Sequence, residues 1–250
     1  MLTISPKYKH LSAFIADVPR LMLTQGATVY EARNLIKVLR APDGTLLNVK
    51  RYHRPSPLNA LVYSTCLRKP KGRRAFDYPP RLLAAGIETP EAVAYIEERR
   101  FGIIGYSYFI SIQCAYRHRL YDVLDMKPGD YTPLAEALGR MTARMHEAGI
   151  LHRDFSPGNV LWDRAADGSF RFSVVDINRM RFGRVTLAEG CAGFARLWGP
   201  ADFFRTLALS YAKERSMDAD RCVELTLGCR RRFWTKYLKH HKMGVNPFAD

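Results

Sequence analysis

The chain has 250 residues, enough for one large domain or for two lobes that share a cleft. Hydrophobic residues make up 47% and charged residues 25% of the sequence, which argues against an intrinsically disordered chain. Lysine and arginine number 39 against 24 aspartate and glutamate residues, for a formal net charge of +15. Such a surface attracts polyanions: nucleic acid, anionic lipid headgroups or phosphorylated glycans.

The five cysteines form no C-x-x-C pair and have no metal-ligand spacing with the seven histidines, which predicts buried free thiols in a reducing compartment. Charged residues and a histidine interrupt the apolar residues of Met1–Arg20, so no signal-peptide core is expected there. The longest apolar stretch, Phe101–Ile112, is about half of a membrane span. These features predict a cytoplasmic protein without a transmembrane segment, which positive charge could hold at a membrane face.

The first hundred or so residues are predicted to form an antiparallel sheet with one helix. Strands are expected over four segments: Ala27–Leu39, Thr45–Tyr52, Glu91–Glu98 and Tyr106–Cys114. The Ala27–Leu39 segment contains a turn near Ala32-Arg33-Asn34. A short helix is expected over Arg73–Ala85, with the Pro79-Pro80 pair interrupting it or marking its start.

The composition then becomes typical of helices. Thr132 is predicted as an N-cap with Pro133 at the first helical position, and Gly149 as the residue that ends this helix. Between them one apolar stripe repeats at spacings of four, three and four: Leu134, Leu138, Met141 and Met145. More helices are expected after residue 195. The sequence therefore predicts an α+β fold, with an N-terminal lobe at residues 1–114 and a C-terminal catalytic lobe at residues 115–250.

The most informative segment runs from Ile150 to Trp162 and reads ILHRDFSPGNVLW. It follows the predicted helix and leads into a short apolar strand, a polar turn and a second strand that ends at Asp176. Phosphoryl transfer needs a carboxylate to take the acceptor proton and divalent metal to neutralise the phosphates. Asp154 suits the first task, and Asn159 and Asp176 offer the hard oxygen atoms that Mg²⁺ prefers.

His152-Arg153-Asp154 with Asn159 matches the catalytic loop H-R-D-x-x-x-x-N of protein kinases, and Asp176 takes the place of the D-F-G aspartate. The amino-acid sequence resembles the bacterial lipopolysaccharide kinases in four stretches: FSPGNVL at 155–161, DIN at 176–178, NVKRY at 48–52 and GI-x-TP at 86–90. The resemblance covers roughly residues 25 to 200. It implies a bilobal protein-kinase-like fold, with a small antiparallel-sheet N-lobe and a mostly helical C-lobe. It also implies use of ATP and Mg²⁺ to phosphorylate a heptose or Kdo sugar of the lipopolysaccharide inner core.

Three residues before the loop are assigned to nucleotide binding by this resemblance. Lys50, on the strand face opposite Leu47 and Val49, is the candidate for the lysine that holds the α- and β-phosphates; an edge-strand lysine facing water is the alternative. Asp77 is the candidate for its helix partner, although kinases have a glutamate there, and a helix-capping aspartate is an equal alternative. Gln113 is expected near the hinge, where adenine would bind backbone groups.

The chain departs from the kinase pattern in several ways. No G-x-G-x-x-G precedes Lys50, and Ser156 stands where many Ser/Thr kinases have a lysine. Arg179 could neutralise transition-state charge or form a structural salt bridge. His152, although placed among the catalytic residues, is expected to brace the loop more than to transfer protons. The absence of an A-P-E triplet argues against a regulated activation segment.

The leading hypothesis is a kinase whose acceptor is an anionic glycolipid at the inner face of the cytoplasmic membrane. A small protein kinase, or a small-molecule kinase like the aminoglycoside phosphotransferases, is the alternative enzyme. The latter usually have H-G-D where this chain has H-R-D. A third hypothesis is a non-catalytic pseudokinase scaffold that binds partners or RNA. The joint presence of four residues argues against it: Lys50, Asp154, Asn159 and Asp176. Nucleic acid is the less favoured partner.

Two basic runs support the membrane hypothesis, although a solvated helix face explains either run equally well. The first comprises Arg68, Lys69, Lys71, Arg73 and Arg74; the second comprises Arg230, Arg231, Arg232, Lys236, Lys239, His240, His241 and Lys242.

Overall fold

The computed structural model describes residues 1–65 and 67–241. It divides into two compact units, one formed by residues 1–84 and 89–115, the other by residues 85–88 and the chain from 116 onward. The short segment 85–88 therefore groups with the second unit, although it precedes the boundary expected after residue 114. Cys66, one of the five cysteines, and Lys242 of the second basic run lie outside the described residues.

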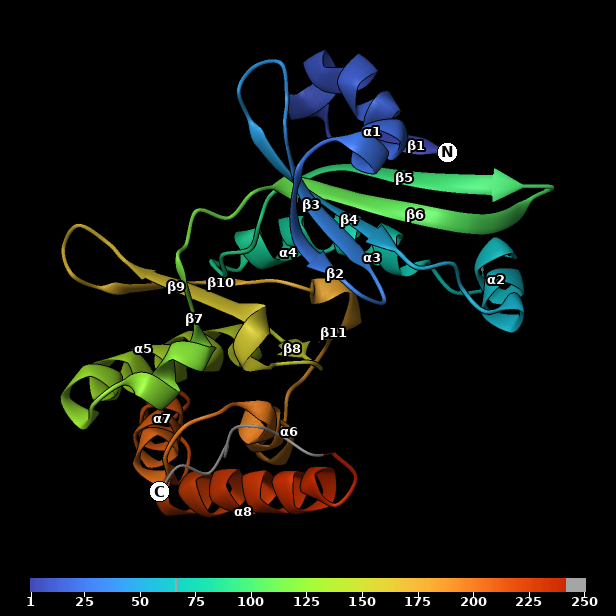
Figure 1. The fold of residues 1–250 in the computed structure, drawn as a ribbon. Coiled ribbons are helices and arrows are strands. Elements are labelled where there is room, and N and C mark those ends of the chain that lie inside the picture. The colour runs from blue at the N-terminus through green and yellow to red at the C-terminus, as the bar shows by residue number, and fades with distance from the viewer. Residues whose placement is uncertain (66, 242–250) are drawn as a thin grey trace. The chain divides into compact units, whose positions relative to one another are not determined.

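The first unit is built on one antiparallel sheet (Figure 1). The spatial order of its strands is β1-β5-β6-β4-β3-β2, and every neighbouring pair is antiparallel. The bounds are β1 Leu2–Ile4, β2 Ala27–Glu31, β3 Leu35–Arg40, β4 Leu46–Tyr52, β5 Ala92–Arg100 and β6 Ile103–Ile112. The predicted strands are confirmed, with the first segment split into β2 and β3 at the expected turn.

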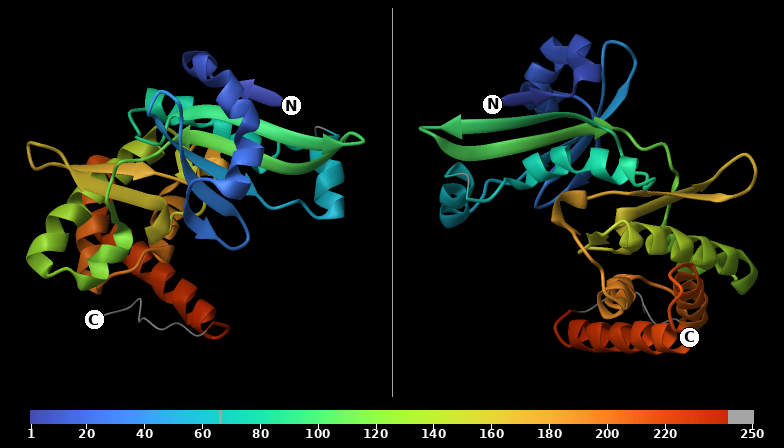
Figure 2. Two further views of the ribbon diagram at one scale, coloured as in Figure 1. Left: turned by 45° about the horizontal axis from the view of Figure 1, so that its top comes forward. Right: turned by 180° about the vertical axis from the view of Figure 1, so that it is seen from behind.

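Helices cover both faces of this sheet, so the expectation of one helix in this part of the chain is wrong. The 3₁₀ helix η1 (Pro6–Leu11) leads into α1 (Ser12–Thr24), which lies on one face, whereas α2 (Pro57–Ser64), α3 (Lys71–Asp77) and α4 (Pro79–Ala84) lie on the other (Figures 1 and 2). The missed helix α1 is amphipathic. Its apolar residues pack into the same core as the buried faces of the strands: Ile15, Val18, Leu21 and Met22.

The second unit contains two small sheets of short strands, and loops connect these strands. One sheet has the order β10-β9-β7, with β7 at His118–Arg119, β9 at Val160–Arg164 and β10 at Phe170–Val174. A second, two-stranded sheet pairs β8 (Ile150–His152) with β11 (Met180–Phe182). Two short 3₁₀ helices lie between consecutive strands: η3 (Pro157–Asn159) between β8 and β9, and η4 (Ile177–Arg179) between β10 and β11. A third, η2 (Leu120–Asp125), leads from β7 into helix α5 (Pro128–Glu147). The catalytic-loop segment thus lies between β8 and β9.

Helices make up the rest of the second unit: α5 (Pro128–Glu147), α6 (Leu187–Gly193), η5 (Phe194–Arg196), α7 (Ala201–Glu214) and α8 (Ala219–Leu238). The predicted stripe of α5 is buried. The helix starts five residues before the predicted Pro133, because Pro128 takes the first position after Lys127. It ends at Glu147, and Gly149, two residues further on, has φ of 69°, as expected of a glycine just past a helix end. At Gly139 the helix approaches α7 so closely that a Cβ would lie 2.6 Å from the Leu207 carbonyl oxygen.

Helix α8 buries four residues spaced four apart, Cys222, Thr226, Arg230 and Trp234. The Arg230 guanidinium lies 4.1 Å from the ring centroid of Phe204 and donates to the Gly199 carbonyl. Arg230 is only 3% exposed, so its inclusion in an exposed basic face is wrong. Arg231, Arg232, Lys236 and Lys239 are exposed, as that hypothesis requires.

The cysteines of the described residues are free: Cys191 and Cys222 are buried, and Cys114 and Cys229 are half-buried. Burial raises the pKa of the Cys191 thiol to about 12, which makes it unreactive at neutral pH. Within residues 1–65 and 67–241, no helix is long and apolar enough to cross a membrane.

The contact between α5 and α7 depends on a buried neutral histidine. Nδ1 of His146 lies 2.8 Å from the Tyr211 hydroxyl, which also accepts a hydrogen bond from Arg215. Burial, together with the charges of Arg215 and Arg181, lowers the pKa of His146 to about 3, against the opposite effect of Glu189. A histidine whose folded pKa is depressed stabilises the fold above its unfolded pKa of about 6.5 and loses that contribution as pH falls.

We therefore expect the His146 contribution to lower the free energy of unfolding by about 2 kcal/mol as the pH falls from about 7.5 to 5. Urea unfolding at several pH values measures this loss. His146→Gln keeps an acceptor for the Tyr211 hydroxyl but does not titrate, so its pH dependence should be shallower by that amount. An unchanged pH dependence in this variant would show that His146 is protonated in the folded state.

Candidate active site

The loop that carries Asp154 is held by backbone and side-chain hydrogen bonds around His152. The Asp154 N–H donates to Nδ1 of His152 (3.1 Å), and Nε2 of His152 donates to the Val175 carbonyl (2.9 Å). Both ring nitrogens are therefore engaged in a neutral imidazole, and burial lowers the pKa of His152, which keeps it neutral. These contacts brace the turn before Asp176, as the sequence indicated for this residue.

Asn159 is tied directly to the same loop. Its Nδ2 donates to the Asp154 carbonyl (2.9 Å), and its own carbonyl accepts from the Val175 N–H (2.9 Å). The side-chain nitrogen is thus used within the loop, and a cation would bind the Oδ1 oxygen, the kind of atom that Mg²⁺ prefers. The role of Asn159 as a metal ligand stays a prediction.

Asp176 follows β10 in a left-handed backbone conformation, with φ of 54° and ψ of 41°. Such a conformation is uncommon outside glycine, asparagine and aspartate, and it is often found at functional sites. One carboxylate oxygen of Asp176 accepts from Nδ2 of the buried Asn178. Asp176 directly follows Val175, whose carbonyl bonds His152 and whose N–H bonds Asn159. Asp154, Asn159 and Asp176 therefore belong to one connected network.

In the described part of the chain no three His, Cys, Asp or Glu side chains gather as a metal-binding group. Mg²⁺ commonly uses one or two carboxylates together with the oxygens of substrate phosphates. Asp176 and Asn159 offer oxygen atoms of this kind and stay the predicted ligands.

Two arginines bind the Asp154 carboxylate. Nη1 of Arg196 donates to Oδ1, and Nη1 of Arg179 lies 3.5 Å from Oδ2. The Asp154 side chain is 21% exposed, against 60% for Arg179 and 45% for Arg196. Arg179 thus has the salt bridge that was one of its two predicted roles. Arg196 was missed because nothing local links it to a residue 42 positions earlier.

Lys50 occupies an interior strand of the first unit. It lies in β4 opposite Ile36 of β3 and Phe109 of β6, so it is not an edge-strand lysine. Leu47 and Val49 are fully buried on the opposite face, as the alternation predicted. Lys50 Nζ lies 5.3 Å from the Tyr52 ring centroid, and the residue is half-buried. Its role toward a nucleotide stays a prediction.

Asp77, the expected partner of Lys50, has two other cationic partners. It is the last residue of α3, and its carboxylate binds Lys69 (2.8 Å) and Arg73 (2.9 Å). Both partners belong to the first basic run, whose charge is thus partly neutralised within the first unit. These ion pairs favour a local structural role for Asp77 over nucleotide binding.

Gln113 follows β6 at the end of the first unit. Its N–H donates to the Leu46 carbonyl (2.9 Å), and its side chain binds Asn48 Nδ2 (2.8 Å) and the Cys114 carbonyl (3.0 Å). Since this N–H is used within the sheet, an adenine contact would depend on the Gln113 carbonyl or on the backbone of Cys114.

Comparison with known proteins agrees with this geometry. The family model described as lipopolysaccharide kinase (Kdo/WaaP) family matches residues 22–186. The serine/threonine-protein kinase pkn2 of Myxococcus xanthus is 35% identical over 96 residues, which are 37% of this chain and 11% of that protein. This chain thus spans about a tenth of the length of that curated relative.

Two solved structures share the fold at low sequence identity. WaaP in complex with acyl carrier protein has a TM-score of 0.64 at 20% identity, covering 97% of this chain and all of that one. The amicoumacin kinase hAmiN, in complex with AMP-PNP, Ca²⁺ and Ami, has a TM-score of 0.61 at 12% identity, covering 95% of this chain and 88% of that one. The expected kinase-like α+β fold is confirmed, and the chain belongs to the lipopolysaccharide kinase (Kdo/WaaP) family.

Proposed function

We propose that this chain is an ATP- and Mg²⁺-dependent kinase that phosphorylates a sugar hydroxyl of the lipopolysaccharide inner core. The observation that carries the proposal is the connected network of Asp154, Asn159 and Asp176, within the segment that the family model matches. A non-catalytic scaffold would not need this combination of a carboxylate, a hydrogen-bonded amide and a second carboxylate on a left-handed backbone.

Each residue has a separate task in this proposal. Asp154 takes the proton of the acceptor hydroxyl as it attacks the γ-phosphate. The carboxylate offers about four lone-pair sites, so its bonds to Arg179 and Arg196 leave a position for that proton. Asn159 and Asp176 would hold Mg²⁺, which neutralises phosphate charge when bound. Lys50 would bind the nucleotide phosphates from the first unit.

The proposal is tested by ATP turnover of the purified protein against a panel of Kdo-terminated and heptose-bearing core glycolipids. Stimulation by one member of the panel would support a sugar kinase and identify the acceptor. The match to pkn2 makes a protein substrate the second candidate. A generic protein substrate should therefore be included, and phosphorylation of that substrate alone would contradict the sugar assignment.

We further propose that positive charge on α8 holds the enzyme on the inner face of the cytoplasmic membrane. In the described part of the second basic run, the lysines and arginines that are exposed are Arg231, Arg232, Lys236 and Lys239. Each basic residue near an anionic bilayer contributes about 1 kcal/mol, and the attraction is screened over ~8–10 Å at near-physiological salt.

Reversal of these four charges is expected to release the protein from anionic vesicles. The binding of the unaltered protein should fall steeply with added salt in the same vesicle-sedimentation assay. A matched control reverses four exposed cations on α5 and α7: Arg140, Arg144, Arg205 and Lys213. If both reversed proteins bind vesicles equally, α8 is an ordinary solvated surface. Competition by RNA at low concentration would instead favour a nucleic-acid partner.

A further inference from the structure

A continuous series of aromatic side chains runs from the catalytic loop to the end of α8. It starts at Tyr121, whose hydroxyl lies 3.2 Å from where a Cβ on Gly158 would be. The series consists of Tyr121, Trp198, Trp234, Phe233, Tyr237 and His241. Successive ring centroids are 4.8, 6.3, 5.0, 5.9 and 4.1 Å apart.

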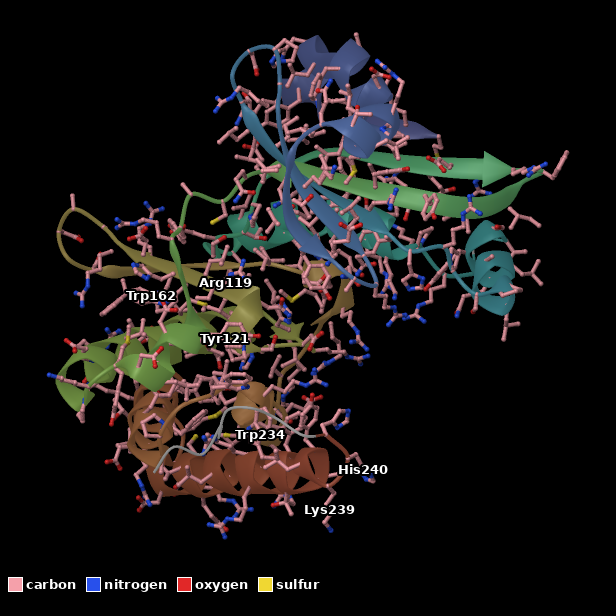
Figure 3. The ribbon with its side chains drawn as sticks, in the orientation of Figure 1. Arg119, Tyr121, Trp162, Trp234, Lys239 and His240 are labelled. Carbon is pink, nitrogen blue, oxygen red and sulfur yellow. The ribbon has the colours of Figure 1, made fainter. Side chains whose placement is uncertain are left out.

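The members of this aromatic series differ in burial. Trp234 is 4% exposed and lies on the side of α8 that faces the rest of the unit, so it anchors the helix (Figure 3). Trp198, Phe233 and Tyr237 are only half-buried, and Tyr121 is 39% exposed. Packing within the unit therefore accounts for Trp234, whereas ring surface of the other members remains open to a ligand.

Arg196 joins this series to the Asp154 carboxylate. Its guanidinium carbon lies 5.4 Å from the ring centroid of Phe233, while Nη1 donates to Asp154. An arginine has five N–H donors. Among the described residues, Asp154 and the Phe233 ring are its partners, so several donors are available to a second anion.

The charges around Asp154 point to the chemistry of that anion. Arg179 and Arg196 place two positive charges on one carboxylate, and their side chains are 60% and 45% exposed. A neutral acceptor alcohol would bring no negative charge of its own to these two guanidiniums. An acceptor with a carboxylate or phosphate close to its reacting hydroxyl would pair with them through charge-assisted hydrogen bonds.

We propose that the acceptor binds on this surface, with a sugar ring packed against Phe233 and Tyr237 and an anionic substituent held by Arg196. A sugar ring suits half-buried aromatic rings because it presents a flat C–H face together with polar edges. The inference rests on the proposed kinase function, and it adds the site and the charge of the acceptor. It assigns specificity to α8, which lies beyond the segment matched by the family model.

The test compares two soluble probes. The first is deacylated inner-core oligosaccharide, which carries carboxylates. The second is the same oligosaccharide with its carboxyl groups reduced to alcohols and its phosphates removed. The wild-type enzyme should have a lower KM for the anionic probe than for the neutral one. Arg196→Gln should reduce that preference by about tenfold or more, because a charge-assisted hydrogen bond is lost. Phe233→Leu should raise KM for both probes without changing the preference.

Arg205→Gln and Leu209→Ala serve as controls, because both side chains are exposed on α7 and lie outside the aromatic series. If Arg196 only holds Asp154 in place, Arg196→Gln lowers kcat for both probes alike, its preference stays intact, and the inference is wrong. Unchanged KM values in Phe233→Leu would also overturn it. Failure of the wild type to phosphorylate either probe would overturn the proposed function, and the inference with it.

Discussion

Replacement of Asp154 by asparagine is expected to lower kcat by about 10²–10⁴-fold, the usual contribution of a positioned general base. Asparagine keeps the size of the side chain but cannot take the acceptor proton. The loop should persist in the variant, because its hydrogen bonds to His152 and Asn159 use the backbone of residue 154. Stopped-time assays of phosphoryl transfer at saturating ATP and acceptor measure the loss.

Nucleotide affinity separates this effect from a general defect. Binding of ATP with Mg²⁺ should stay close to that of the wild type, since Asp154 is not assigned to the nucleotide. Urea unfolding should remain cooperative and near the wild-type midpoint. Turnover within about threefold of the wild type would show that another group accepts the proton.

Replacement of Asp176 by asparagine should lower kcat by a similar factor, about 10²–10⁴-fold, but through loss of a metal ligand that supplies several kcal/mol of charge stabilisation. The variant should also need more Mg²⁺ to bind nucleotide, which distinguishes it from Asp154→Asn. Asparagine is preferable to alanine here because residue 176 has φ of 54°. Alanine in a left-handed conformation would add about 1–2 kcal/mol of strain and confuse a local fold defect with a metal defect.

Mg²⁺ titration of nucleotide binding is the measurement for this variant. Asp167→Asn is the matched control, because Asp167 is exposed in the turn before β10 and its carboxylate caps the Ser169 N–H. The control should bind nucleotide at the wild-type Mg²⁺ concentration. An unaltered Mg²⁺ requirement in Asp176→Asn would remove Asp176 from the metal site.

The site elements that could be predicted from the sequence are those fixed by local chain geometry. Asp154 and Asn159 are five residues apart in one loop, and a single hairpin brings Asp176 back to that loop. The alternation in Leu46–Tyr52 correctly placed Lys50 opposite the buried face. In both cases the period of the strand or the length of the turn determines the result.

Contacts between segments distant in sequence could not be predicted in this way. Arg196 binds Asp154 because α6 and η5 fold back on the loop, and only tertiary structure brings them together. The expected pairing of Asp77 with Lys50 relied on the kinase pattern. Lys69 and Arg73, eight and four residues away, supply nearer partners for that carboxylate.

Two of the wrong expectations, the exposed Arg230 and the missing helix at Ser12–Thr24, could have been corrected from patterns in the sequence. Cys222, Thr226, Arg230 and Trp234 repeat at intervals of four, and this spacing assigns Arg230 to the buried stripe of a helix. The run of three arginines concealed it. The amphipathic pattern of Ser12–Thr24 also predicts a helix, although Pro19 lies inside it.

We propose that Asp154 and Asp176 serve transfer of the γ-phosphate of ATP to an inner-core sugar. The most direct test incubates the full chain with ATP, Mg²⁺ and deacylated inner-core oligosaccharide and records the mass of the sugar product. The oligosaccharide should gain the mass of one phosphoryl group, EDTA should prevent this gain, and Asp154→Asn should reduce it to a trace. Consumption of ATP with no phosphorylated sugar, or equal product from the wild type and Asp154→Asn, would show that these residues do not serve such a transfer.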